Sequence, residues 1–143
     1  MNQPLYTVEI LRLAASIPHL GSLDDPQGRA DVRSPTCGST VAAQVRLDEH
    51  GRVAAFGQQV EACAFGQASS ALLGARAIGR NAAEVADAVT LFAAWLDGSR
   101  EDPGEWPGLT ALAPARPRTA RHGAMLLPFR ALLAAIRDAE ARR

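Results

Sequence analysis

The sequence predicts an α+β fold in which a small antiparallel β-sheet of about three strands packs against several α-helices. The first observation is an alternation of apolar residues over 41–47, followed by a turn-forming DEHG segment and a second strand-like stretch over 52–60. This pattern is typical of a β-hairpin. The second observation is a helical spacing of apolar residues, which occurs before the hairpin and recurs in the segments after it.

The segment before the hairpin begins with a predicted helix that ends near Pro18 and Gly21. Residues 21–36 are rich in Gly, Pro, Asp and Ser, so they predict a loop with a short edge strand around 30–34. This loop leads directly to Cys37. The expected apolar face of the helix comprises Leu5, Val8, Ile10, Leu11, Ala14, Ala15 and Ile17.

Helices are expected in the segments after the hairpin. One begins at Cys63 and ends at Gly79, and the next begins with a capping box of Asn81 and Glu84 and ends near Gly98. A last helix closes the chain. The predicted apolar stripes are Ala64, Ala68, Ala71, Leu72, Ala75 and Ile78, then Val85, Ala88, Val89, Phe92 and Leu96, and finally Leu126, Phe129, Leu133 and Ile136.

Two segments between the helices are expected to be irregular. Residues 99–108 contain acidic residues, prolines and glycines, so they predict a surface loop. The segment ahead of the last helix concentrates Arg116, Arg118 and Arg121. These arginines either dock an acidic partner or form a solvated surface.

The composition indicates a soluble globular protein. The 143 residues fit a single domain, 1–143, and 48% of them are hydrophobic. Fifteen basic and fifteen acidic residues give a formal net charge of zero, so neither a nucleic acid nor a membrane is an expected partner. The N-terminus does not resemble a signal peptide, and no apolar run reaches the roughly 20 residues that cross a bilayer. A cytoplasmic location is therefore expected.

In a reducing cytoplasm the two cysteines are expected to be free thiols or metal ligands rather than a disulfide. Gly38 permits a tight turn that leaves the sulfur of Cys37 pointing out of a loop. Cys63, at the start of a helix, would lie at the positive end of the helix dipole, which favours the thiolate. The thiolate is the form that binds metals and acts as a nucleophile. For each cysteine the alternative is a packed, inert side chain.

His122 is a candidate third ligand. A neutral imidazole would complete a set of two cysteines and one histidine for zinc or iron, with one exchangeable position. The alternative is a polar surface histidine. His19 and His50 lie in a loop and a turn without ligand candidates near them in the sequence.

No nucleophile elbow, phosphate loop or paired carboxylate motif is visible, so an ordinary hydrolase is not indicated. These patterns alone leave the function undecided.

Three short motifs occur along the chain in a defined order. Cys37 begins C-G-S ahead of the hairpin, and Cys63 lies in A-C-A-F-G-Q-A-S-S at the start of a helix. The last helix contains R-H-G-A-M-L-L-P-F-R-A-L over 121–132. In order and spacing these motifs resemble the U-type iron-sulfur cluster assembly scaffolds, the family of the NifU N-terminal domain and the SufU-like proteins. The form of the last motif is more similar to the SufU-like branch.

This resemblance implies a small α+β scaffold in which three cysteines and an aspartate hold zinc or an assembling iron-sulfur cluster. Cys37 and Cys63 match two of those cysteines. Ser39 stands where the family has the aspartate, and it is a much poorer ligand. One negative charge of the family's site is therefore missing.

The third cysteine of the family is also replaced. Gly123 or Ala124 occupies its place, and His122 matches the histidine that precedes this cysteine in many of the scaffolds. His122 is therefore the expected substitute ligand. Two thiolates and a neutral imidazole carry less negative charge than the family's set, so a weaker or more labile bound metal is expected.

The resemblance implies a non-enzymatic scaffold or sulfur acceptor. Cys37 and Cys63 are the candidates to receive persulfide sulfur from a cysteine desulfurase. Together with His122 they are the candidates to hold iron or a labile iron-sulfur cluster, which would pass to downstream apo iron-sulfur proteins. One alternative is a zinc-dependent sulfurtransferase, in which zinc holds a thiolate until the desulfurase arrives. Another is a metal-free interaction module that uses residues 116–121.

Overall fold

The computed structural model describes residues 6–35 and 38–143. Within these residues the strands form an antiparallel sheet in the order β1-β2-β3, and helices pack against it, which confirms the predicted α+β class. The elements in chain order are α1 (Val8–Ala14), β1 (Gly28–Arg33), β2 (Thr40–Leu47), β3 (Val53–Glu61), α2 (Ala64–Arg76), α3 (Ala82–Leu96), the 3-10 helices η1 (Leu109–Ala115) and η2 (Thr119–Arg121), and α4 (His122–Ala141).

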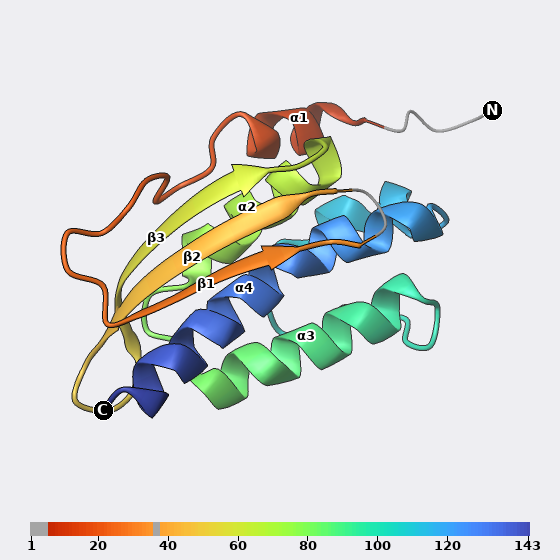
Figure 1. Cartoon of the computed structure of the whole chain (residues 1–143). Helices are drawn as coiled ribbons and strands as arrows, with labels where there is room; N and C mark the ends of the chain where they lie inside the picture. The colour runs from red at the N-terminus through yellow and green to blue at the C-terminus, as the bar shows by residue number, and fades with distance from the viewer. Residues whose placement is uncertain (1–5, 36–37) are drawn as a thin grey trace.

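The helices cover one face of the sheet (Figure 1). Helix α4 packs across β1 and β2, and α2 lies next to α4 and contacts β3. Helix α3 packs on α4, and α1 packs on α2. Helices α2 and α4 are therefore the two that contact the sheet, and α1 and α3 pack on them.

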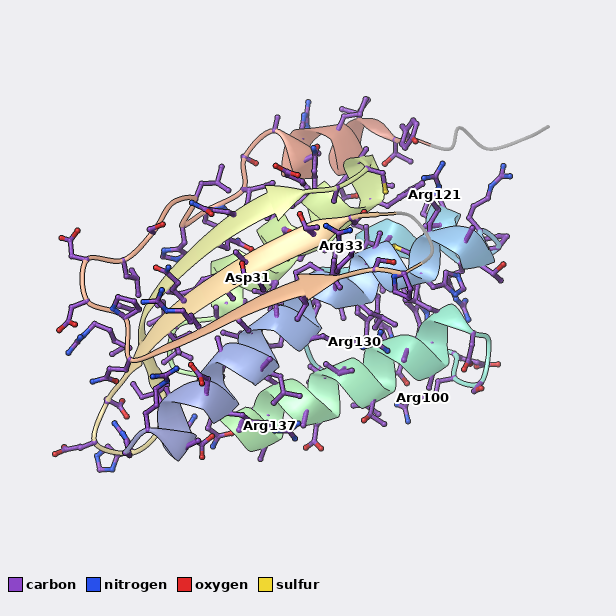
Figure 2. All side chains as sticks on the ribbon, viewed as in Figure 1. Asp31, Arg33, Arg100, Arg121, Arg130 and Arg137 are labelled. Carbon is purple, nitrogen blue, oxygen red and sulfur yellow. The ribbon has the colours of Figure 1, made fainter. Side chains whose placement is uncertain are left out.

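The sheet has one apolar and one polar face. Strand β1 turns Asp31 and Arg33 to the polar face, where both side chains are exposed (Figure 2). Strand β2 alternates strictly between more and less buried positions, as the sequence predicts. Its inward residues, each at most 6% exposed, are Val41, Ala43, Val45 and Leu47.

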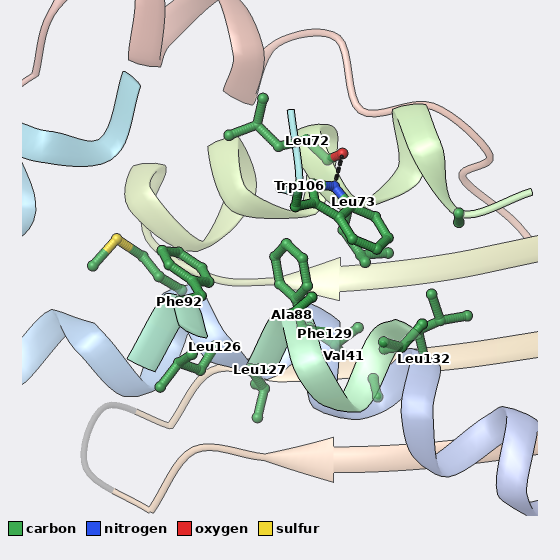
Figure 3. Close-up of a cluster of buried hydrophobic side chains, with 14 of the residues drawn as sticks. Val41, Leu72, Leu73, Ala88, Phe92, Trp106, Leu126, Leu127, Phe129 and Leu132 are labelled. Carbon is green, nitrogen blue, oxygen red and sulfur yellow. Dashed lines mark hydrogen bonds between the residues drawn. The ribbon is translucent and has the colours of Figure 1, made fainter. Parts of the chain in front are cut away.

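Aromatic rings occupy the core beneath α2 (Figure 3). The ring of Phe129 lies edge-to-face against Phe92 and Trp106, with centroid distances of 5.3 and 5.1 Å. The indole N–H of Trp106 donates to the carbonyl of Leu72 at 2.9 Å. The prediction of a surface loop over 99–108 is therefore wrong at Trp106. Burial of a large apolar ring lowers the free energy of the fold once the N–H group of the ring has a hydrogen-bond partner.

Helix α1 is present, but the expected apolar face is wrong. Only Ile10 is fully buried, whereas Val8 and Leu11 are 65% and 51% exposed. A helix of seven residues has about two turns, and only a narrow strip of it contacts α2. Leu5 lies outside the described residues.

Helix α4 also differs in detail from the sequence pattern. Leu133 is only partly buried, whereas its neighbour Leu132 is fully buried. The reason is that α4 contacts the sheet on one side and α2 and α3 on others, so its buried surface is wider than one stripe.

The 3-10 helices between α3 and α4 were not expected. Among the described residues, no helix combines the length and the apolar character that spanning a membrane requires.

The predicted capping box at the start of α3 is confirmed. The Asn81 side chain accepts the N–H of Glu84 at 2.9 Å, and the Glu84 carboxylate accepts the N–H of Asn81 at 3.1 Å. Arg52, the residue before β3, donates to the same carboxylate at 2.6 Å. The capping residue Glu84 therefore also connects the β2–β3 hairpin to α3.

Candidate metal and sulfur site

Cys63 lies at the N-terminus of α2, as the sequence predicts. It is the N-cap residue, its backbone is extended, and its side chain makes no capping hydrogen bond. The carbonyl of Cys63 accepts the N–H of Gln67 at 2.9 Å, which closes the first turn. The side chain is half-buried against the core. This position combines partial packing with the end of a helix that favours negative charge.

The first turns of α2 and α4 lie side by side. A Cβ atom at Gly66 would stand 3.3 Å from the carbonyl oxygen of Ala124, so glycine at this position allows the close approach without displacement of its neighbours. One turn further along α2, the Ser69 hydroxyl donates to the carbonyl of Met125 at 2.5 Å. Pro128 has no N–H, so the carbonyl of Ala124 lacks its usual helical donor four residues later. Both carbonyls at this point of α4 are turned toward α2.

Cys37 lies outside the described residues, so its role stays a prediction. The described residues beside it close the end of the β1–β2 hairpin. The N–H of Ser34 donates to the carbonyl of Ser39 at 2.8 Å, and the N–H of Gly38 donates to the carbonyl of Ser34 at 3.2 Å. Gly38 has a φ of +73°, the left-handed conformation that a tight turn requires. Ser39, which the resemblance aligns with the family's aspartate, is buried.

A groove joins the end of this hairpin to the start of α4. Its lining includes Ser34 and Pro35 on the hairpin side and Thr119 and Gly123 on the α4 side. Ala124, the next residue, lies against Gly66 of α2. The hairpin end and the starts of α2 and α4 therefore meet at one end of the molecule (Figure 1). The sequence motifs had placed the candidate ligands on these three segments.

His122 is the first residue of α4, and its ring is fixed by a hydrogen bond. Its Nε2 atom lies 2.8 Å from the carbonyl of Arg116. A carbonyl can only accept, so Nε2 carries the hydrogen, and in the neutral ring Nδ1 keeps a lone pair for a metal. The pKa of Asp97 at the end of α3 is lowered, first by hydrogen bonds from Ser99 and last by His122. The ring thus lies near the end of α3.

Within residues 6–35 and 38–143, no group of three or more His, Cys, Asp or Glu side chains is arranged to hold a metal. Cys63 and His122 both belong to these residues. A site with three protein ligands at this end of the molecule therefore requires Cys37 in addition. Ser39, Gly123 and Ala124, which the resemblance aligns with the family's aspartate and third cysteine, have no carboxylate or thiolate.

The arginines before α4 differ in their contacts. The guanidinium of Arg116 lies 4.8 Å from the ring centroid of Trp95. It also donates to the carbonyls of Trp95 and Arg100 at 2.8 and 3.2 Å. Arg116 is thus bound within the fold and is not free to dock a partner. Arg118 and Arg121 make no ion pair with any other described residue.

The sequence interpretation missed two arginines that line the groove, Arg33 on β1 and Arg130 on α4 (Figure 2). One signal was available for Arg130. It follows Gly123 by seven residues, so both lie on one face of a helix. Nothing in the local pattern indicated that Arg33 borders this groove, and Arg33 also lines the groove on the polar face of the sheet, with Asp31 and Glu61.

A family model, described as the NifU-like N terminal domain, matches residues 5–95. The chain belongs to this family. The N-terminal part of a nitrogen-fixing NifU-like protein from Brucella abortus has a similar structure, with a TM-score of 0.89. The two sequences are 33% identical, over 97% of this chain and 96% of the other. The resemblance deduced from the cysteine motifs is confirmed.

The NifU-like fold is shared with a more distant protein, described as a scaffold for iron-sulfur cluster assembly by the SUF system, from the thermophilic Fervidobacterium islandicum. The TM-score is 0.82 at 17% identity, over 92% of this chain and 96% of the other. The chain matches no curated protein sequence. The family model ends before α4, so it supports a role in iron-sulfur cluster assembly without covering His122 or Gly123.

Proposed function

We propose that this NifU-like domain is a non-enzymatic cytoplasmic scaffold for iron-sulfur cluster assembly. It accepts sulfur from a cysteine desulfurase on Cys37 or Cys63. Cys37, Cys63 and His122 hold iron or a labile cluster, which then passes to apo iron-sulfur proteins. Membership of the family and the position of Cys63 together support this proposal.

The position of Cys63 is the observation that carries the proposal. A thiol at a helix N-terminus without a side-chain cap has a favourable environment for negative charge, because the first N–H groups of a helix have no partner within the helix. Partial exposure gives a donor protein access to the sulfur. The close packing of α2 on α4 fixes this sulfur relative to the segment that begins with His122.

Sulfur transfer needs no further reagent than the two proteins. The thiolate of the scaffold attacks the outer sulfur of the desulfurase persulfide. A new sulfur–sulfur bond forms on the scaffold, the sulfur–sulfur bond of the donor breaks, and the donor cysteine leaves as a thiolate. The sulfur arrives as a persulfide, and iron and electrons are required before it becomes sulfide in a cluster.

The replaced residues fit a carrier better than a storage site. Ser39 provides no carboxylate, and neither Gly123 nor Ala124, one of which takes the place of the third cysteine, provides a ligand. Two thiolates and one imidazole leave a coordination position open and less negative charge around iron. Such a cluster is expected to leave the protein readily when an acceptor with a full set of thiolates binds.

Anaerobic reconstitution with ferrous iron, cysteine and a desulfurase tests this function. We expect the wild-type chain to gain iron and acid-labile sulfide, with sulfur-to-iron charge-transfer absorption in the visible range. Cys63→Ser and Cys37→Ser each abolish most of this absorption, since each removes an anionic ligand. His122→Ala weakens it. His50→Ala, which changes an exposed histidine in the β2–β3 turn, is the matched control and leaves the spectrum unchanged.

The zinc-dependent sulfurtransferase is the second function, and it uses the same two thiolates. Tight stoichiometric zinc, together with failure to retain iron, would place it ahead of the scaffold. Persulfide on Cys63 after incubation with the desulfurase, detected by mass spectrometry, is expected in both cases. A chain that keeps neither metal and acquires no persulfide contradicts both functions.

A further inference from the structure

Strand β1 lies at an edge of the sheet, with β2 on one side and no other strand of the described chain on the other. In an antiparallel pair, the backbone groups of successive residues turn alternately toward the partner strand and away from it. The N–H of Ser34, the residue after β1, donates toward β2, to the carbonyl of Ser39 at 2.8 Å. The residues that alternate with this series therefore turn their N–H and carbonyl groups to the open edge.

Arg29, Asp31 and Arg33 are the residues of β1 with outward backbone groups. The N–H of Arg29 agrees with this assignment, because it donates away from β2, to the carboxylate of Asp138 on α4 at 3.0 Å. Neither Asp31 nor Arg33 has a backbone hydrogen bond to a described residue outside the β1–β2 pair. The free edge is short, since the contact of Arg29 closes one end and Pro35, which has no N–H, closes the other.

A groove of about 390 Å³ lies beside this free edge, between the end of β1 and the first half of α4. Val32 and Leu127 contribute apolar surface to it, and Gly123 has no side chain to fill it. Helix α4 packs beneath β1, and α3 packs on α4 further out (Figure 1). The space next to the edge therefore has a floor of helices.

The apolar face of β1 is incompletely covered at this edge. Ala30 and Val32 are only partly buried. Their partners on β2, Ala43 and Val41, are at most 2% exposed. Helix α4 thus covers the middle strand but leaves the side of β1 next to the groove accessible. A strand added at this edge would bury the remaining apolar surface, which favours association.

Asp31 and Arg33 place opposite charges along the same edge. Both side chains are exposed on the polar face of the sheet (Figure 2). Neither makes an ion pair with another described residue. Directly opposite residues of an antiparallel pair have their side chains on the same face, where opposite charges stabilise the pair and like charges destabilise it. An added strand is therefore selected by the charges that it places opposite Asp31 and Arg33.

We propose that the free edge of β1 binds a single extended segment of a partner protein by antiparallel strand addition. The segment has an acidic, an apolar and a basic residue in chain order. The acidic residue lies opposite Arg33 and the basic residue opposite Asp31. The apolar residue between them turns to the other face, into the groove against Val32 and Leu127. The outward backbone groups of β1 provide the hydrogen bonds.

A single segment fits this edge better than a second copy of the domain. Two β1 edges would also bring complementary charges together, since Asp31 of each copy would lie opposite Arg33 of the other. However, each copy has α4 beneath this edge and α3 further out (Figure 1). The helices of two copies would therefore compete for the same space, whereas an extended segment has no helix layer of its own.

The bound segment would lie close to the candidate metal and sulfur site. The groove includes Pro35 at the end of the hairpin and Gly123 at the start of α4, and both segments border that site. A partner held at β1 would therefore stay beside the end of the molecule that carries the cysteines. This link to the site rests on the proposed scaffold function, whereas binding of the segment does not.

Nuclear magnetic resonance titration of the metal-free full-length chain with a capped peptide, Ser-Thr-Glu-Val-Lys-Thr-Ser, tests the proposal. We expect the amide signals of Asp31, Arg33 and Leu127 to shift. Hydrogen exchange of the Asp31 and Arg33 amides should slow, whereas that of Val32, which already pairs with β2, should change little. The peptide with exchanged charges, Ser-Thr-Lys-Val-Glu-Thr-Ser, should bind about tenfold more weakly, because it places like charges opposite each other.

Arg33→Glu tests the charge selection by rescue. This variant should lose about tenfold in affinity for the first peptide and gain affinity for Ser-Thr-Lys-Val-Lys-Thr-Ser, in which a lysine lies opposite the new glutamate. Arg12→Glu is the matched control, because Arg12 is exposed on α1, without an ion pair to another described residue. It changes the net charge equally and should leave the affinity for the first peptide unchanged. Circular dichroism checks that both variants keep the fold.

Three results would overturn the proposal. The first is the absence of shifts at Asp31 and Arg33 at millimolar peptide. The second is equal affinity for the two charge arrangements, or an equal loss in Arg12→Glu, which would mean diffuse electrostatic attraction. The third is self-association of the chain without peptide that Arg33→Glu abolishes, which would assign the edge to a second copy. Since the protein is metal-free, a negative result leaves the iron chemistry of Cys63 untouched, and failure of iron binding leaves the titration valid.

Discussion

The hydroxyl of Ser69 and the backbone carbonyl of Met125 are joined by a buried hydrogen bond of 2.5 Å. This bond connects α2 to α4 one turn beyond the point where Gly66 approaches Ala124. It therefore fixes the start of α4, and with it His122, relative to the cysteine at the start of α2. The geometry of the candidate site therefore depends on this helix pair as well as on the hydrogen bond that holds the His122 ring.

Removal of the Ser69 hydroxyl should loosen the helix pair. We expect Ser69→Ala to lower the free energy of unfolding by about 1 kcal/mol or more, because a buried hydrogen bond between helices is lost. Ser70→Ala is the control, since Ser70 is equally buried but donates within α2, to the carbonyl of Gly66. Urea unfolding of both variants measures the difference. Equal costs would contradict the special role of the Ser69 bond.

A methyl group at Gly66 should push the two helices apart. In Gly66→Ala the new Cβ would lie 2.7 Å from the Cβ of Ala62 and 3.3 Å from the carbonyl oxygen of Ala124. Overpacking of this kind costs about 1–3 kcal/mol. We expect a lower unfolding midpoint and less iron retained after reconstitution. Adding Ala62→Gly should restore part of the stability, and a Gly66→Ala chain as stable as wild type would show that the approach is not tight.

The stacked guanidinium of Arg116 should contribute to stability through its planar shape. Arg116→Lys keeps the charge but loses the two-pronged contact with the carbonyls of Trp95 and Arg100. We expect a loss of about 1–2 kcal/mol in the free energy of unfolding. Arg118→Lys, at an exposed position without an ion pair among the described residues, is the control and should cost little. Matching losses in the two variants would contradict this account.

The capping box should make the stability of the fold depend on pH. The pKa of Glu84 is lowered from the ordinary value of 4.5, first by the hydrogen bond from the Asn81 N–H and then by the Arg52 side chain. A lowered pKa in the folded state means that the stabilisation is present above 4.5 and is lost as pH falls through the folded value. Nuclear magnetic resonance titration of the Glu84 carboxyl group measures this directly. Arg52→Gln should raise the midpoint, and an unchanged midpoint would contradict the assigned cause.

Local patterns in the sequence were sufficient for the hairpin of β2 and β3 and for the starts of α2 and α3. The alternation in β2 predicted its buried face, and Asn81 with Glu84 predicted the start of α3. Both features depend on residues close together in the chain. The burial of Trp106 was not predictable in this way, because its partners Leu72 and Phe129 lie far away in the sequence.

The candidate site was predictable only in part. The position of Cys63 at a helix start followed from the local pattern and is confirmed. The approach of α2 to α4 could not be read from the sequence, although Gly66 and Pro128 make it possible. The hydrogen bond from His122 to the Arg116 carbonyl could not be predicted from the sequence either, since it depends on the 3-10 turns before α4.

Mössbauer spectroscopy of the chain reconstituted with isotopically enriched iron tests the scaffold function most directly, because it reports the ligands of each iron. The account predicts signals of tetrahedral, sulfur-coordinated iron in the wild-type chain, and their loss in Cys63→Ser. Iron coordinated only by oxygen and nitrogen, with the same spectrum in wild type and Cys63→Ser, would contradict it.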